Sequence, residues 1–137
     1  MSRQIFDSFT TFDDFLVYLA VAVVLLVAFI AVYVRVTPYR EIALIREGNM
    51  AASYSLAGAI IGFVLPLSAA IQHSVNLVDM AFWGVVALVV QVLAFVVVKL
   101  LIPGLPRDIP ADKGSAGFLL GALSVAVGLL DAACMSY

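Results

Sequence analysis

The 137-residue chain is 65% apolar and only 12% charged, with a formal net charge of −2. Soluble domains carry roughly half apolar and about a quarter charged residues, so lipid must be the solvent for most of this chain. The acidic balance excludes nucleic acid as an expected partner, and the single cysteine excludes a disulfide framework.

Four apolar stretches are long enough to cross a membrane, because a helix needs about 20 apolar residues to span roughly 30 Å of hydrocarbon. Their uninterrupted apolar character lacks the alternation of barrel strands, so we expect helices. The connections between them are too short for a soluble domain. The sequence therefore predicts an all-α, polytopic membrane protein in which residues 1–137 form one transmembrane domain, with spans at about residues 15–36, 51–71, 78–102 and 115–135.

The loop after the first span predicts a short helix. Thr37 before Pro38 is typical of an N-cap followed by proline at the first helical position, and we expect the helix to run to about Glu47. Glu41, Arg46 and Glu47 are then expected on a solvated face that could dock a cytoplasmic partner.

Glycines in the second and fourth spans mark close helix packing, because small residues let helix backbones approach in lipid. Whether this packing lies within one chain or between chains stays open at this point. Pro66, also in the second span, removes one backbone hydrogen bond and predicts a kink, static or gating. The candidate packing glycines are Gly58, Gly62, Gly117, Gly121 and Gly128.

Three polar residues inside the spans form a candidate intramembrane site. Asp131 is a functional hypothesis by default, because ionisable groups are rare in spans, although a neighbouring helix could simply cover it. It continues the stripe of Ser124 and Gly128, so we expect it to face protein. Gln91 is expected to hydrogen-bond across helices, with a pore-lining role as the alternative.

Neither a metal site nor an enzyme is expected. His73 and Cys134 are one imidazole and one thiol from separate spans, which is a weak ligand set. The sequence contains no nucleophile–base motif or phosphate-binding loop and has no soluble volume to enclose a substrate. We therefore expect no cofactor.

The basic residues predict the orientation. Lys and Arg near span ends favour the cytoplasm, which places the first and third loops there and both termini in the periplasm of a bacterial inner membrane. Only Arg3 lies on the opposite side. The cytoplasmic set is Arg35, Arg40, Arg46, Lys99, Arg107 and Lys113.

The two halves of the chain look like copies of one unit, at about residues 14–73 and 78–135. A two-span unit inserts both copies the same way up, which gives parallel repeats. Two pairs of landmarks recur 65 residues apart: Asp14 with Asp79, and Pro38 with Pro103.

Several motifs together resemble the YjfL-type inner-membrane proteins, the family with domain of unknown function 350. The resemblance covers essentially the whole chain and implies a four-span, duplicated bacterial membrane protein with no established biochemical activity. Relatives often accompany envelope-stress genes, which implies a context. The motifs are residues 37–41 (TPYRE), 44–49 (LIREGN), 62–67 (GFVLPL), 73–74 (HS), 83–91 (WGVVALVVQ) and 127–137 (VGLLDAACMSY).

Two functions remain open. The first is a structural or partner-docking module that forms homo-oligomers in the lipid bilayer through its small-residue faces and presents the first loop to a cytoplasmic envelope-stress protein. The alternative is an oligomeric small ion channel or transporter that uses Asp131 and Gln91, since four helices alone make a filled bundle. We favour the first, because few polar side chains point inward and the resemblance implies no transported substrate.

Overall fold

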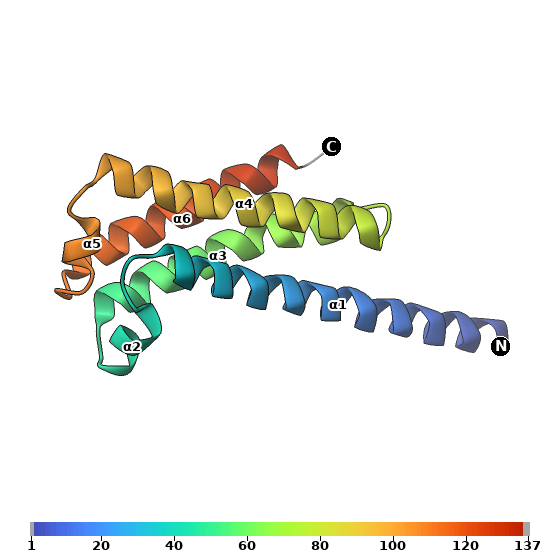
Figure 1. The fold of residues 1–137 in the computed structure, drawn as a ribbon. Coiled ribbons are helices and arrows are strands. Elements are labelled where there is room, and N and C mark those ends of the chain that lie inside the picture. The colour runs from blue at the N-terminus through green and yellow to red at the C-terminus, as the bar shows by residue number, and fades with distance from the viewer. Residues whose placement is uncertain (1, 136–137) are drawn as a thin grey trace.

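The computed structural model describes residues 2–135, which form helices and no strand. Four of these helices are long and apolar enough to cross a membrane, namely α1, α3, α4 and α6. The predicted all-α, four-span architecture is therefore confirmed. The helices are α1 (Ser2–Val36), α2 (Glu41–Arg46), α3 (Met50–His73), α4 (Leu77–Leu101), α5 (Leu105–Asp108) and α6 (Gly114–Cys134) (Figure 1).

The predicted spans match α3, α4 and α6 to within one or two residues at each end, but α1 begins at Ser2, well before the predicted span. Side-chain caps explain two of the sharp starts. The Asn49 side chain accepts a hydrogen bond from the Ala52 amide at 2.8 Å, and Asn76 accepts one from the Asp79 amide at 2.8 Å. Each satisfies an amide that the first turn of the helix leaves unpaired.

The predicted N-cap at Thr37 is wrong. The Thr37 amide still donates to the Tyr33 carbonyl at 3.0 Å, and its hydroxyl donates to the Val34 carbonyl at 3.1 Å, so Thr37 closes α1 instead of opening the next helix. As a result α2 begins only at Glu41, three residues after Pro38. This shift changes which side chains of the loop are buried.

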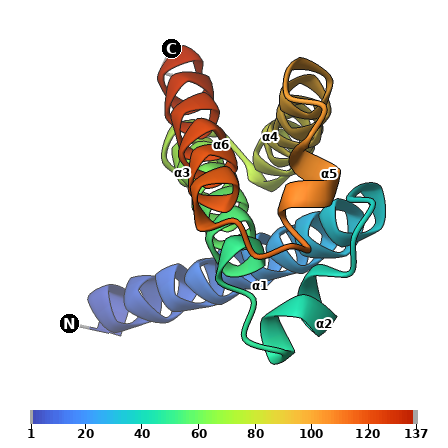
Figure 2. The same cartoon turned by 90° about the vertical axis from the view of Figure 1, so that its left-hand side faces the viewer.

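α3 and α6 form the closest helix pair, and α4 packs against both of them (Figures 1 and 2). α1 packs on this group from Tyr18 to Tyr33, and its two fully buried residues, Phe29 and Tyr33, lie near its C-terminal end. The Phe29 ring stacks on Phe63 of α3 with centroids 4.6 Å apart, and the Tyr33 ring meets Phe95 of α4 edge-on at 5.4 Å. Toward its N-terminus α1 diverges from the other long helices (Figure 1).

The connection between α5 and α6 is fastened to the start of α3. Asn49 donates from its amide nitrogen to the Ile109 carbonyl at 3.0 Å. One carboxylate oxygen of Asp112 accepts from the backbone amides of Met50 and Ala51 at 2.8 and 3.0 Å. These bonds join the two halves of the chain at the loop end of the bundle.

Replacing Asp112 with alanine is expected to cost about 1 kcal/mol of folding free energy, because it removes the acceptor of two amides in the first turn of α3. Asp112→Asn keeps an acceptor oxygen and tolerates the left-handed backbone at this position, where φ is +59°. Unfolding titrations in mixed detergent micelles measure the folding free energies of the two variants and of the wild type. Equal losses in the two variants would contradict a capping role.

The helix order long–short–long occurs twice, in α1–α3 and in α4–α6. The backbone has a positive φ shortly before both α3 and α6, at Gly48 (+87°) and at Asp112 (+59°), 64 residues apart. A duplication would produce both likenesses. The duplication and its boundaries stay a prediction.

Candidate functional site

The glycines of α3 and α6 bring the two backbones into direct contact. A Cβ added to Gly58 would overlap the backbone of Gly121, and one added to Gly117 would overlap Ala51. A Cβ on Gly128 would lie within 2.7 Å of the Gly62 Cα. The small-residue faces therefore pack within one chain, which answers the question that the sequence left open and removes these faces as surfaces for a second copy.

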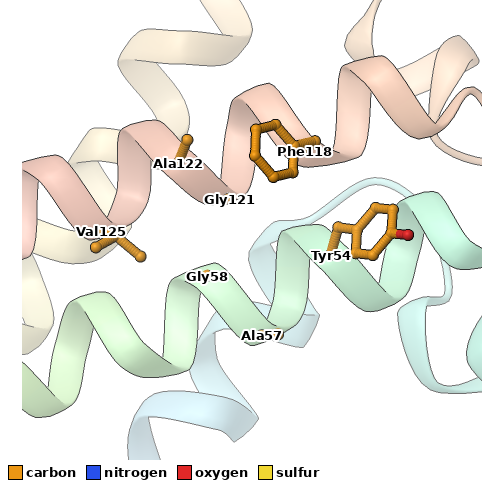
Figure 3. A pocket seen from close by; sticks show the side chains of 7 residues that line it. All are labelled: Tyr54, Ala57, Gly58, Phe118, Gly121, Ala122 and Val125. Carbon is orange, nitrogen blue, oxygen red and sulfur yellow. The ribbon is translucent and has the colours of Figure 1, made fainter.

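A shallow apolar groove of about 370 Å³ runs alongside this contact (Figure 3). Tyr54 of α3 and Phe118 of α6 stand at one end of it with their rings edge-to-face, 6.4 Å between centroids. Its lining offers no charged side chain, so it is a packing feature of the helix pair. The remaining lining residues are Ala57, Gly58, Gly121, Ala122 and Val125.

Pro66 lies buried inside α3, at the height of the glycine contact. Because proline has no amide hydrogen, the Gly62 carbonyl lacks its normal helical donor. Gly128 of α6 lies directly against this carbonyl oxygen, at the position where a Cα–H···O contact forms between close helices. Pro66 thus frees a carbonyl that the neighbouring helix covers; a kink or gating role stays a prediction.

Gln91 and Ser124 meet in the middle of the bundle. The Gln91 side-chain nitrogen donates to the Ser124 backbone carbonyl at 2.7 Å, and the Ser124 hydroxyl donates to the Leu120 carbonyl at 2.9 Å. Gln91 is 1% exposed, and its side-chain oxygen has no partner among residues 2–135. The bond joins α4 to α6.

Asp131 lies two turns further along α6, roughly 10 Å from Ser124 at 1.5 Å per residue. It is partly exposed, and within the described chain one of its carboxylate oxygens is buried without a hydrogen-bond partner. The structure therefore brings two members of the predicted intramembrane site together and leaves Asp131 apart from them.

The loop end of the bundle contains a second polar site, which the sequence did not predict. Glu41 is 0% exposed, so the expected solvated position of this residue is wrong, whereas Arg46 and Glu47 are exposed. The physical reason is the late start of α2, which makes Glu41 its first residue and leaves it buried in the loop fold.

The Glu41 cluster, defined as Glu41, Tyr33, Thr37, Tyr39 and Ser55, comes from α1, the loop, α2 and α3. Every member is almost fully buried. Within the described chain, both carboxylate oxygens of Glu41 and the hydroxyls of Tyr33 and Tyr39 are buried without a hydrogen-bond partner. These are four of the six such atoms in the described chain, so most of its unsatisfied buried polar atoms lie in this cluster.

Burial sets the chemistry of the cluster. Loss of water around the carboxyl raises the pKa of Glu41 to about 8, and the neighbouring Thr37 hydroxyl offsets only part of this. Burial, and then the nearby Glu41 charge, also raise the pKa of Tyr39 above its ordinary value, with a partial offset from Ser55. Glu41 therefore holds a proton at neutral pH, beside a cavity of about 440 Å³ that Arg40 and Arg46 also line.

Among residues 2–135, no group of three or more His, Cys, Asp or Glu side chains is placed to hold a metal ion. Cys134 is exposed at the end of α6.

Comparisons with known proteins agree with the predicted resemblance. The family model for the Domain of Unknown Function (DUF350) matches residues 5–135. The chain is 36% identical to the inner membrane protein YjfL of Escherichia coli K12 over 98% of this chain and 99% of that protein. It is 29% identical to the transmembrane protein YshE of Bacillus subtilis over 85% of this chain and 88% of the relative. No solved structure gives a significant match. The chain belongs to the DUF350 family of multi-pass membrane proteins.

Proposed function

We propose that this protein is a non-enzymatic structural module of the bacterial inner membrane that works as a homo-oligomer, with α1 as the surface between chains. One observation carries the proposal. In the most apolar stretch of α1, 6% of the residues are buried within the chain, against 50% in α3. A helix left this open by its own bundle offers the largest surface for association.

The surfaces of the other three long helices are more covered within the chain than that of α1, which supports α1 as the contact between copies. The glycines of α3 and α6 are occupied by each other, and α4 packs on both. Within the described chain, α1 is the long helix with the fewest buried residues, Phe29 and Tyr33. Oligomerisation is therefore assigned to α1 in place of the small-residue faces.

The basic residues at the loop ends of the spans favour a cytoplasmic position for α2 and periplasmic termini. Arg46 and Glu47 are exposed there, and we assign them to docking of a cytoplasmic partner in envelope maintenance. Glu41 takes no part in such docking, since its side chain is enclosed.

Conduction is the less favoured function. Gln91 and Ser124 bond across the bundle interior, and the adjacent glycine contact joins the helix backbones without a gap. A path through one chain would have to break both. A path between chains would need polar side chains on α1, whose span offers apolar ones.

The mass of the purified protein in lipid nanodiscs tests the proposal. Light scattering is expected to show two or more chains per particle, and a single chain would overturn it. Ion flux through proteoliposomes provides the second arm. We expect tight vesicles from wild type and from Asp131→Leu alike; flux in wild type that Asp131→Leu abolishes would establish the channel instead.

A further inference from the structure

We propose that the N-terminal segment of α1, residues 2–19, pairs with the same segment of a second copy as a parallel two-stranded coiled coil that continues beyond the bilayer. This inference rests on the proposed homo-oligomer and names the contact that holds it. Helix length, apolar spacing and the shared orientation of the copies carry it.

The length of α1 exceeds what a membrane can cover. Its 35 residues measure about 52 Å at 1.5 Å per residue, whereas about 20 residues cross the hydrocarbon. Arg35 marks one end of its apolar part, and Asp13 and Asp14 mark the other. Residues 2–14 therefore extend roughly 20 Å into water. Figure 1 shows α1 running on past the turn between α3 and α4.

Five of the apolar residues of this segment follow a heptad pattern, although the exposed Phe6, Phe15 and Val17 lie outside it. The five are spaced alternately four and three residues apart, which is the spacing of the a and d positions that meet in a coiled coil. All five are exposed within the chain. They are Ile5 (53% exposed), Phe9 (66%), Phe12 (55%), Leu16 (46%) and Leu19 (48%), and we call them the α1 seam.

The charged residues fit the same register. With Phe9 at position a, Asp7 and Asp14 both fall at position f, on the side of the helix away from the seam. Asp13 falls at position e, and in a parallel pair it faces Ser8 at position g of the partner, a hydroxyl rather than a second acid. No like charges meet across the seam within this segment.

A second copy is the occupant that fits this seam. Copies of one membrane protein insert the same way up, so their α1 helices are parallel and at equal height in the membrane. Each seam residue of one copy then lies level with the same residue of the other. The helix leaves the span without a break between Ser2 and Val36, so it cannot also turn to lie flat on the membrane surface. Further along, the same spacing reaches Leu26, Ile30 and Tyr33, which pack in the chain's own core, so the two copies separate before Leu26.

Cysteine cross-linking tests the seam in native membranes, in a Cys134→Ser background. Phe9→Cys and Phe12→Cys place a thiol on the seam, and Asp7→Cys places one on the opposite side of the same helix as the matched control. Mild oxidation is expected to give a disulfide-linked dimer from both seam variants and at least about fivefold less from the control, because a and d residues face their counterparts.

The outcomes separate this inference from the proposed function. An oligomer in nanodiscs that shows no seam-specific cross-link overturns the seam and leaves the oligomer standing. A monomeric wild type overturns both. An environment-sensitive dye on Phe12→Cys that nitroxide lipids quench would show that the segment lies on the bilayer, which also overturns the seam. A reducible dimer limited to the seam variants supports it.

Discussion

Replacing Gly128 with leucine is expected to abolish most of the folded protein. A Cβ at this position meets the carbonyl, carbon and Cα of Gly62, and these are backbone atoms that cannot rotate away. Overfilling a packed interior costs about 1–3 kcal/mol even where side chains can adjust, and more where they cannot. The yield of monodisperse protein in mild detergent and its helical circular dichroism on heating measure the effect.

Ala126→Leu is the matched control, because Ala126 lies on α6 two residues before Gly128, on the opposite side of the helix, and its side chain is exposed. The same apolar group added on the lipid-facing side should leave yield and melting unchanged. If Gly128→Leu folded as well as Ala126→Leu, the two backbones could not be in contact at this glycine.

Raising the pH through about 8 is expected to loosen the loop end of the bundle. Glu41 has a pKa of about 8 in the folded chain against 4.5 without burial, so between these values the folded state holds a proton that the unfolded state has released. Stability from this group is fully present below pH 4.5 and is lost as the pH rises through 8. The loss approaches about 1.4 kcal/mol per pH unit within that window.

No charged group around Glu41 offsets the loss of stability that its ionisation causes. Tyr33 faces it from α1 and Tyr39 from the loop, and neither carries a positive charge. Arg40 and Arg46 line the adjacent cavity, but neither forms an ion pair with Glu41 in the described chain. An ionised Glu41 is therefore left without a counter-charge.

Glu41→Gln imitates the protonated acid and should flatten the pH dependence of the melting temperature between about pH 4.5 and 8, because no proton is then linked to folding at this position. Glu47→Gln is the control, since Glu47 is exposed in the same loop, and it should melt like wild type at every pH. A slope that persists in Glu41→Gln would assign the titration to another group.

Long apolar runs and glycine spacing predicted much of this fold, because in lipid they directly determine where helices lie and which faces can approach. Gly58 and Gly128 were identified as packing residues from their spacing. The sequence could not tell that their partners belong to the same chain, since a glycine stripe has the same appearance in a monomer and in a dimer.

The burial of Glu41 could not be predicted in the same way. It depends on hydrogen bonds of Thr37 that extend α1 by one position, and on α2 folding against α3. Both are tertiary choices that local capping preference does not reveal. The partner of Gln91 was similarly hidden, because it is the backbone carbonyl of Ser124, and every residue has one.

Cross-linking between α3 and α6 tests most directly whether the glycine faces pack within one chain and leave α1 to join copies. Tyr54→Cys and Phe118→Cys, combined in the Cys134→Ser background, replace two rings that lie 6.4 Å apart. A short bifunctional thiol reagent is expected to give a cross-linked species that migrates as a single chain on a denaturing gel. A covalent dimer as the main product would contradict this arrangement, because α3 of one chain would then pack on α6 of another.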